Sequence, residues 1–312
     1  FDLSSRIFLG LKAILSKENP DCILVHGDTT TSMITSLSAF YKKIPVFHVE
    51  AGLRTNDMFS PFPEEMNRKL TANLSSYHFS PTESAKSNLI KENIEDSRIF
   101  ITGNTVVDSL EYIKNEIKTK NFSDNFLSQI PNFSQIENTE SKIILVTGHR
   151  RESFGEGFEN ICRALKKLAA EFPEVQIIYP VHLNPNVIEP VNRILQDVKN
   201  IHLIKPLAYL DFIKLMDKSY LILTDSGGIQ EEAPSFGKPV LLMRNNTERP
   251  EALEAGTVKL TGLSQDKIYA LTKQLITDSK IYNRMVSSKN PFGDGKASNR
   301  IKKVLKDVLI NG

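Results

Sequence analysis

The sequence predicts an α/β protein with two consecutive parallel sheets, and three observations indicate this. Short apolar runs alternate with longer amphipathic stretches along most of the 312 residues, a pattern typical of parallel strands joined by helices. The alternation stops once, in the polar stretch 121–141, and restarts at Lys142. Glycine, histidine and acidic residues follow most apolar runs, where open α/β sheets bind ligands. We therefore expect two Rossmann-like domains with a cleft between them.

Apolar runs predict the strands of the first sheet, and amphipathic stretches predict the helices between them. The strands are Cys22–Val25, Pro45–Val49, Tyr77–Phe79 and Ile99–Ile101. The helices are Thr30–Lys42, Glu64–Leu74 and Glu83–Glu92. In the first helix, the helical period predicts a buried stripe that consists of Met33, Ile34, Leu37, Phe40 and Tyr41.

The second sheet is predicted in the same way from Lys142 onward. Its strands are Ile143–Val146, Gln176–Tyr179, Ile201–Ile204, Leu221–Thr224, Val240–Met243 and Val258–Leu260. A helix is expected at Phe158–Phe172, with one face made by Phe158, Ile161, Leu165, Leu168 and Phe172. A closing amphipathic helix is expected from the apolar positions Ile301, Val304, Leu305, Val308 and Leu309.

The composition is that of an ordinary globular protein, 40% hydrophobic and 24% charged. The formal net charge of +2 gives no reason to expect nucleic acid or a membrane surface as a partner. Cys22 and Cys162 lie in apolar segments without a paired spacing, which indicates reduced core residues of an intracellular protein. No apolar run approaches the roughly 20 residues of a membrane span, and no signal-peptide pattern is found. The expected location is the cytoplasm.

Acidic residues follow the predicted strands of the first sheet. Asp28 precedes a threonine run and also suits a helix cap. Glu50 directly continues a buried strand, where a carboxylate is costly unless it has a partner or a task. Glu64 and Glu65 follow Pro63 and also suit the first turn of a helix. Carboxylates gathered in one site raise the pKa of one another, which suits proton transfer to and from carbon.

The histidines divide into two groups. His26, His48 and His78 flank or interrupt strands and are interpreted as structural. His149 stands between Gly148 and Arg150 after a strand, away from any apolar face, and is therefore a candidate for chemistry.

The stretch DSGGIQEEAPSFGKP, residues 225–239, offers a site for an anion. Glycines at a strand-to-helix turn allow close backbone approach, and the first N–H groups of a helix bind anions. Ser226, Gly227 and Gly228, together with Arg249, therefore suit a diphosphate. Glu232, one turn further along, suits a ribose diol.

Other ligands are not supported by the sequence. The segment GEGFEN lacks the third glycine of a dinucleotide fingerprint, and FGKP is not a P-loop. No cluster of cysteine, histidine and carboxylate residues has metal-ligand spacing. We expect neither a metal nor another cofactor.

Long ordered motifs in the chain resemble one family almost from end to end, most weakly in 121–141. They are VHGDTTTSMITSLSAFY, VFHVEAGLRT, SPFPEEMNRKLT, FITGNTVVDSL, VTGHRRESFG, YPVHLNPNV, LTDSGGIQEEAPSFGKPVLLMRNNTERPEAL and NPFGDGKAS. The family is that of the bacterial non-hydrolysing UDP-N-acetylglucosamine 2-epimerases, whose fold resembles the GT-B glycosyltransferases. The resemblance implies domains of residues 1–103 and 104–298, with the closing helix, 299–312, returning to the first domain.

The resemblance also implies an activity and site residues. The family interconverts UDP-GlcNAc and UDP-ManNAc for surface polysaccharides, by eliminating UDP to give 2-acetamidoglucal and then adding it back. The implied catalytic residues are Asp28, Glu50, Glu64 and His149, with the acid and the base left unassigned. The implied nucleotide contacts are Phe212, Ser226, Gly227, Gly228, Glu232 and Arg249. His182 matches a position of a second, allosteric UDP-GlcNAc site in some members, and a homodimer is expected.

The chain opens with FDLSSRIFLGLKAIL, without methionine and already in a helical pattern. Family members begin with a strand and a loop that bears an arginine and a lysine. We therefore expect that the N-terminal segment is missing, that the first sheet has an uncovered edge, and that these residues alone fold poorly or are inactive.

Alternative functions share the UDP site. A GT-B glycosyltransferase would need an acceptor and no base at C2, and a hydrolysing 2-epimerase would release free ManNAc. A UDP-sugar-binding protein without activity would bind and not exchange the C2 proton.

Overall fold

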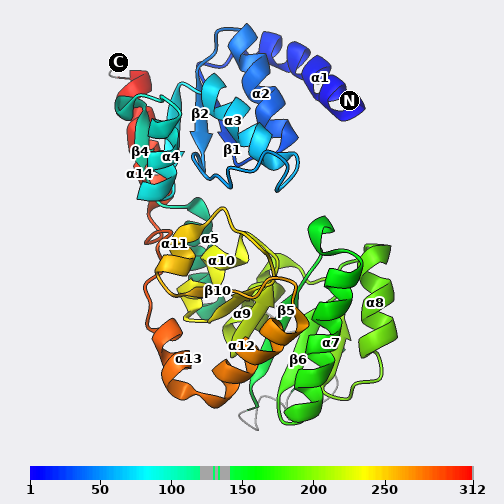
Figure 1. Cartoon of the computed structure of the whole chain (residues 1–312). Helices are drawn as coiled ribbons and strands as arrows, with labels where there is room; N and C mark the ends of the chain where they lie inside the picture. Colours follow the sequence, from blue (N-terminus) through cyan, green and yellow to red (C-terminus); the bar gives the residue numbers. More distant parts are fainter. Residues whose placement is uncertain (120–128, 131–132, 134–140, 311–312) are drawn as a thin grey trace. The chain divides into compact units, whose positions relative to one another are not determined.

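A computed structural model describes residues 1–119, 129–130, 133 and 141–310 (Figure 1). Most of the predicted polar stretch 121–141 lies outside the described residues. The chain forms two compact units, of which unit 1 comprises Phe1–Glu111 and Phe292–Gly312 and unit 2 comprises Tyr112–Pro291. The predicted domain boundaries after residues 103 and 298 stay a prediction. None of the described helices is long and apolar enough to cross a lipid bilayer.

Unit 1 contains a parallel sheet in the order β1-β2-β3-β4. Its strands are β1 (Ile23–His26), β2 (Val46–Val49), β3 (Tyr77–Ser80) and β4 (Ile99–Ile101). Its helices are α1 (Asp2–Glu18), α2 (Thr30–Tyr41), α3 (Glu64–Leu74), α4 (Glu83–Lys91), the start of α5 (Thr105–Thr119) and α14 (Ala297–Ile310). Each strand predicted for this sheet is confirmed, with ends that shift by one residue at most.

The last helix of the chain packs on the first sheet. Ile301 of α14 joins Phe47 and Phe79 in one buried cluster, whose apolar area removed from water stabilises the fold. Asp108 of α5 accepts hydrogen bonds from the backbone N–H groups of Ala297 and Ser298 at 2.9 and 2.7 Å. These bonds satisfy N–H groups at the start of α14, which otherwise have no partner inside the helix.

The buried face of α2 differs from the predicted stripe. Phe40 and Tyr41 are 60% and 69% exposed, so their placement in the stripe was wrong. Ile34 is buried as predicted, and small side chains share the buried face with it, because α2 is packed between α1 and α3. The buried residues are Ser32, Ile34, Ser36, Ser38 and Ala39. Helical periodicity locates a face, whereas the space between neighbouring helices decides the size of residue that fits there.

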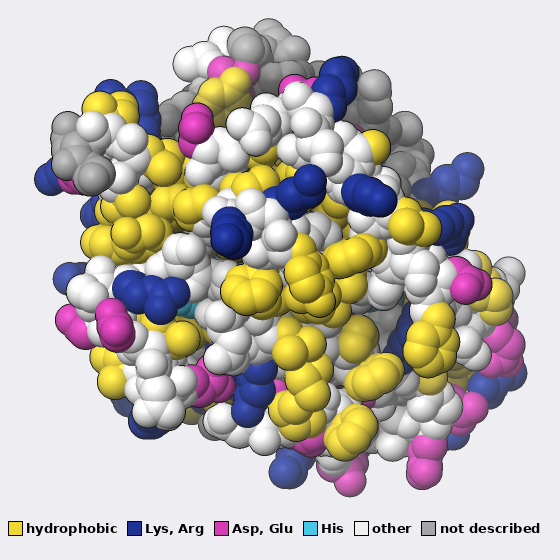
Figure 2. All heavy atoms as spheres, turned by 90° about the horizontal axis from the view of Figure 1, so that it is seen from above, with side chains coloured by type: hydrophobic (Ala, Val, Ile, Leu, Met, Phe, Trp, Pro, Cys, Tyr) yellow, Lys and Arg dark blue, Asp and Glu magenta, His cyan; other side chains and the backbone are white. Residues whose placement is uncertain are grey.

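Large hydrophobic side chains are exposed on the first two helices of unit 1. Figure 2 shows hydrophobic side chains gathered on one face of the molecule, and the exposed ones of α1 include Leu3, Leu9 and Ile14. Within α1, only Leu15 is buried. The first helix therefore contributes little to the core of unit 1.

Unit 2 contains a parallel sheet in the order β10-β9-β8-β5-β6-β7. Its strands are β5 (Ile143–Thr147), β6 (Gln176–Pro180), β7 (Ile201–Ile204), β8 (Leu221–Thr224), β9 (Val240–Leu242) and β10 (Val258–Leu260). Its helices are the end of α5, α7 (Glu156–Glu171), α8 (Pro185–Leu195), α9 (Tyr209–Lys218), α10 (Ile229–Glu232), α11 (Pro250–Glu254), α12 (Gln265–Thr277) and α13 (Ser279–Val286). The predicted strands are confirmed here too, and Phe158, Ile161, Leu165 and Leu168 of α7 are buried as predicted.

Candidate active site

Two acidic residues leave neighbouring strands of unit 1 at the same edge of the sheet. His26 of β1 pairs in register with Val49 of β2, so Gly27–Asp28 and Glu50 follow side by side. Gly27 and Glu50 have φ angles of +68° and +63°. This left-handed region is uncommon for residues other than glycine, and such backbones cluster at functional sites. A Cβ atom on Gly27 would lie 3.1 Å from Oε2 of Glu50, so the glycine makes room for the carboxylate.

Glu50 has hydrogen-bonding and charged neighbours in unit 1. Asn104 donates a hydrogen bond from Nδ2 to Oε1 of Glu50 at 3.0 Å. The ring of His26 places Nε2 3.5 Å from the other oxygen, Oε2. The Glu50 side chain is 19% exposed and can therefore still meet a ligand. His26, interpreted from the sequence as structural, is thus a neighbour of a candidate catalytic group.

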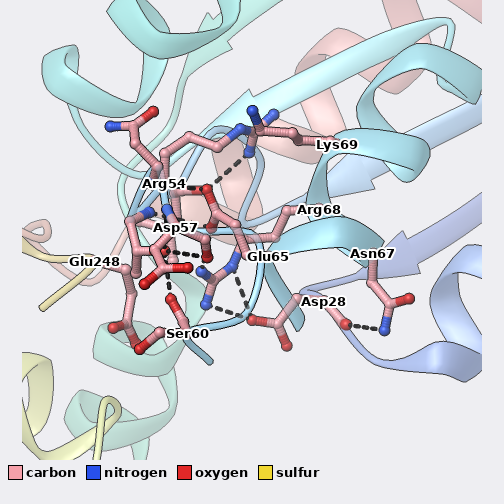
Figure 3. Close-up of polar contacts among 12 residues, drawn as sticks. Asp28, Arg54, Asp57, Ser60, Glu65, Asn67, Arg68, Lys69 and Glu248 are labelled. Carbon is pink, nitrogen blue, oxygen red and sulfur yellow. Dashed lines mark hydrogen bonds and ion pairs between the residues drawn. The ribbon is translucent and has the colours of Figure 1, made fainter. Parts of the chain in front are cut away.

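Asp28 is bound by an arginine that the sequence analysis did not single out. Arg68 of α3 donates from Nε and Nη2 to Oδ2 of Asp28 at 3.0 and 2.7 Å. The alternative of Asp28 as a helix cap is wrong, because the N-cap of α2 is Thr29, whose Oγ1 accepts from the N–H of Ser32. Figure 3 shows Arg68 between Asp28 and Glu65. The sequence did not indicate the pairing of Arg68 with Asp28, because the two residues are far apart along the chain.

The two adjacent glutamates at the start of α3 differ in environment. Glu64 is the first residue of the helix and is half-buried, whereas Glu65 is fully buried. Pro63 is the residue just before the helix. Glu64 therefore remains the candidate that can reach a ligand, whereas the Glu65 side chain makes its contacts inside unit 1.

Two buried histidines lie next to each other in the first sheet. His48 of β2 pairs in register with His78 of β3. Burial lowers the pKa of His48 to about 4 and that of His78 to about 3. His48 contacts the carbonyl oxygen of Gly27 through Nε2 at 2.9 Å. Both rings are neutral core groups, which agrees with the structural interpretation.

In unit 2, a buried aspartate holds the loop that carries His149. Oδ2 of Asp225 accepts hydrogen bonds from the backbone N–H groups of His149 and Arg150, both at 2.8 Å. Nδ1 of His149 lies 3.7 Å from the other oxygen, Oδ1. Asp225 stands first in the stretch DSGG, yet the sequence analysis assigned it no role. Its position directly after a buried strand, like that of Glu50, was the signal.

His182 lies against His149. The ring centroids are 5.2 Å apart and the planes differ by 17°. His182 is exposed, and its Nδ1 accepts from the N–H of Asn184 at 3.1 Å. The structure thus brings together two residues for which the resemblance implies separate sites.

The glycine stretch after β8 is followed by a short helix. α10 spans only Ile229–Glu232 and continues as a 3₁₀ turn, Ala233–Phe236. The N–H of Ser226 donates to Oγ1 of Thr224 at 2.9 Å. A Cβ atom on Gly227 would lie 2.7 Å from Nη1 of Arg249, whereas one on Gly228 would meet nothing within 4 Å. The helix start expected after the glycines is present as a single turn, and its backbone N–H groups are what it offers an anion.

Arg249 is buried between carboxylates. It donates from Nε to Oε1 of Glu231 and from Nη1 to Oε1 of Glu248. The other oxygen of Glu248 accepts from Nη1 of Arg244 at 3.1 Å, and Arg244 is also buried. The positive charge that Arg249 was expected to offer a diphosphate is thus already compensated by carboxylates of unit 2.

Glu232 and Phe212 belong to adjoining parts of unit 2. The hydroxyl group of Tyr209 donates to Oε1 of Glu232 at 2.8 Å, and Phe212 is half-buried on the same helix as Tyr209. Burial raises the pKa of the Glu232 carboxyl, and the hydrogen bond from Tyr209 opposes this effect. The structure places these two candidates on α9 and α10.

The chain is similar to known proteins along nearly its whole length. The model of a protein family described as UDP-N-acetylglucosamine 2-epimerase matches residues 1–306. A protein of Escherichia coli strain K12 with that name is 56% identical over 310 residues, which are 99% of this chain and 82% of the relative. This match does not test the expectation of a missing N-terminal segment, which stays a prediction.

Solved structures show the same architecture. A crystal structure of UDP-GlcNAc 2-epimerase from Neisseria meningitidis bound to UDP-GlcNAc is 48% identical, with a TM-score of 0.91. That match covers 97% of this chain and 80% of the other. A Methanocaldococcus jannaschii UDP-GlcNAc 2-epimerase, in complex with UDP-GlcNAc and UDP, is 35% identical with a TM-score of 0.81 and covers 97% of this chain and 80% of that one. The predicted fold class of two parallel α/β sheets is confirmed.

Proposed function

The chain belongs to the UDP-N-acetylglucosamine 2-epimerase family, and from this premise we propose that it interconverts UDP-GlcNAc and UDP-ManNAc at C2. The observation that carries the proposal is the pair of strand-end carboxylates, Asp28 and Glu50, on adjacent parallel strands. Support also comes from the Neisseria relative, which is bound to UDP-GlcNAc. Inversion at C2 requires removal and return of a proton on carbon, for which positioned carboxylates are suited.

The proposed route has two balanced halves. A carboxylate takes the C2 proton, the C1–O bond to UDP breaks, and a C1–C2 double bond forms, which gives UDP and 2-acetamidoglucal. In the second half, UDP adds back to C1 and a proton reaches C2 from the opposite face. Asp28, Glu50 and Glu64 are the proposed acid and base groups, and His149 is proposed to contact the reacting sugar or the leaving phosphate.

The nucleotide is proposed to bind to residues of unit 2. Ser226, Gly227 and Gly228 are assigned to the diphosphate, because backbone N–H groups at a turn bind anions. Glu232 is assigned to the ribose diol, to which a carboxylate oxygen can accept hydrogen bonds. Phe212 is assigned to the uracil and Arg249 to a further nucleotide contact.

Further proposals rest on the family resemblance. The protein acts as a homodimer in the cytoplasm and supplies ManNAc units for surface polysaccharides. His182 contributes to a second UDP-GlcNAc site that regulates the enzyme.

Incubation of the full-length protein with UDP-GlcNAc in D₂O tests the proposed function. The expected result is UDP-ManNAc, with deuterium at C2 and the UDP linkage intact. Free ManNAc would instead identify a hydrolysing enzyme, and sugar transfer only after addition of an acceptor would identify a glycosyltransferase. Binding of the nucleotide sugar without exchange of the C2 proton would identify a UDP-sugar-binding protein without activity.

Glu50→Gln tests the role of the carboxylate itself. The amide keeps the shape of the side chain but cannot take a proton from carbon, so C2 exchange should be lost while UDP affinity is retained. Loss of UDP binding with unchanged exchange per bound substrate would move Glu50 to a binding role.

A further inference from the structure

We propose that Glu65 is a positioning residue for this reaction and that it acts through Arg68 on Asp28. The inference rests on the proposed function, because it assumes that the Asp28 carboxylate takes part in the chemistry. It concerns a residue that does not itself reach the substrate, since Glu65 is fully buried within unit 1.

Both oxygens of the Glu65 carboxylate are engaged. Oε1 accepts from the N–H of Asn56 at 3.0 Å, and Oε2 accepts from the N–H of Thr55 at 3.1 Å. Oε2 also accepts from Nη1 of Arg68 at 2.9 Å. A buried carboxylate is costly without such donors. Glu65 therefore fixes the loop after β2 and one arm of Arg68 at the same time.

Arg68 connects this carboxylate to the candidate site. Its Nη1 faces Glu65, while its Nε and Nη2 both face Oδ2 of Asp28 (Figure 3). The guanidinium group is planar and rigid, so fixing one arm fixes the direction of the other two donors. Arg68 is buried, whereas the Asp28 side chain is 29% exposed. The buried Arg68 therefore sets the direction of the partly exposed Asp28 carboxylate.

The backbone of Asp28 is held separately. Nδ2 of Asn67 donates to the carbonyl oxygen of Asp28 at 3.0 Å. Loss of the Glu65 charge should therefore leave the loop after β1 in place and change mainly the direction of the Asp28 side chain. This separation makes a positioning role distinguishable from a general loss of structure.

Unit 1 also contains a second ion pair between an arginine and a glutamate. Arg54 donates from Nε and Nη2 to the two oxygens of Glu92 at 2.9 and 2.6 Å. The Arg54 side chain is as fully buried as that of Arg68, and Glu92 is 24% exposed. Glu92→Gln therefore removes the charged partner of a buried arginine while the hydrogen bonds from Arg68 and Asn67 to Asp28 keep both their donors and acceptors.

The first experiment compares Glu65→Gln with Glu92→Gln in the full chain. For Glu65→Gln, kcat for UDP-GlcNAc epimerisation should fall by about 100-fold, the loss typical of a misplaced catalytic group. KM and UDP affinity should change little. Glu92→Gln should lower the melting temperature and leave kcat unchanged. An equal loss of kcat in both variants, or none in Glu65→Gln, would overturn the inference.

A double-mutant cycle then asks whether Glu65 acts through Asp28. The residual turnover of Asp28→Asn should be the same with and without Glu65→Gln, because a carboxylate that is gone cannot be misplaced. Multiplicative losses would show a general structural effect and overturn the proposal. If Glu65→Gln does not fold, Arg68→Lys replaces it in the cycle, since lysine keeps the charge and loses the planar fork.

Failure of the proposed function would be visible separately. Absence of epimerisation by the unaltered protein, or full activity of Asp28→Asn, would refute the chemistry assigned above and the inference with it. Failure confined to the Glu65 variants would refute the inference alone.

Discussion

The rings of His149 and His182 are nearly parallel, with centroids 5.2 Å apart. His149 follows β5 and His182 follows β6, and these strands are neighbours in the sheet of unit 2. The loop of His149 is held by Asp225, whereas His182 packs on the ring from the other loop. The ring of the candidate catalytic histidine is therefore steadied by a residue that the resemblance places in a different site.

Removal of the His182 ring should slow turnover. Aromatic pairs contribute about 0.5–1.5 kcal/mol beyond burial, so His182→Ala should lower kcat by roughly 2- to 10-fold. His182→Phe keeps a ring and should retain most of the rate. Initial rates at saturating UDP-GlcNAc measure both variants, and equal rates for the alanine and phenylalanine variants would contradict a stacking role.

Asp225→Ala should destabilise unit 2. The change removes the acceptor of two backbone N–H groups, and hydrogen bonds to a charged group are worth about 1.5–3 kcal/mol each. Asp225→Asn keeps one carbonyl oxygen as an acceptor and should cost less. Urea unfolding of the two variants gives the comparison, and an unchanged midpoint for Asp225→Ala would show that the loop does not depend on this carboxylate.

Glu248→Gln should be strongly destabilising. Glu248 lies between Arg244 and Arg249, and removal of one partner from a buried ion pair costs about 3–5 kcal/mol. The surface pair of Glu171 with Lys273 offers a control, because Glu171→Gln breaks an exposed pair that contributes little. Chemical denaturation should separate the two variants clearly, and similar unfolding midpoints would argue against a compensating role for Glu248.

Stability should fall on the acidic side because of the buried histidine pair. Unfolded histidine binds a proton near pH 6.5, whereas the native pKa values are about 4 for His48 and about 3 for His78. Between these values only the unfolded state is protonated, so stability decreases as pH falls from about 6.5 toward 4, by about 1.4 kcal/mol per pH unit for each ring.

His78→Leu tests this linkage. The change removes a titrating group from the core, so the free energy of unfolding should depend less steeply on pH between about 6.5 and 4. Urea titrations at several pH values measure the slope. An unchanged slope would mean that His78 is not the neutral buried group described above.

Gly227→Ala should be less stable than Gly228→Ala. An added Cβ atom at Gly227 would lie 2.7 Å from Arg249 and 2.9 Å from Glu248, so the buried ion pair would have to move. The same atom at Gly228 meets nothing within 4 Å. Thermal unfolding of both variants checks the difference, and equal melting temperatures would mean that the ion pair adjusts without cost.

Much of the fold was predictable because it depends on local periodicity. Strands such as Leu221–Thr224 are buried on both faces and therefore read as continuous apolar runs. Glu50 could be singled out for a similar reason, since a carboxylate at the end of such a run needs a partner. Helical period did not reveal that Phe40 lies on the exposed face of α2, because the small residues opposite it are selected by neighbouring helices.

The sequence by itself determined the order of strands and helices, the family, and the acidic residues at the strand ends of unit 1. Only the tertiary structure decided which charges meet: Arg68 with Asp28 and Glu65, and Arg249 with Glu231. The reason is physical. Alternation of apolar and polar residues is a property of neighbours along the chain, whereas a salt bridge depends on distance in space, which packing sets between residues remote in sequence.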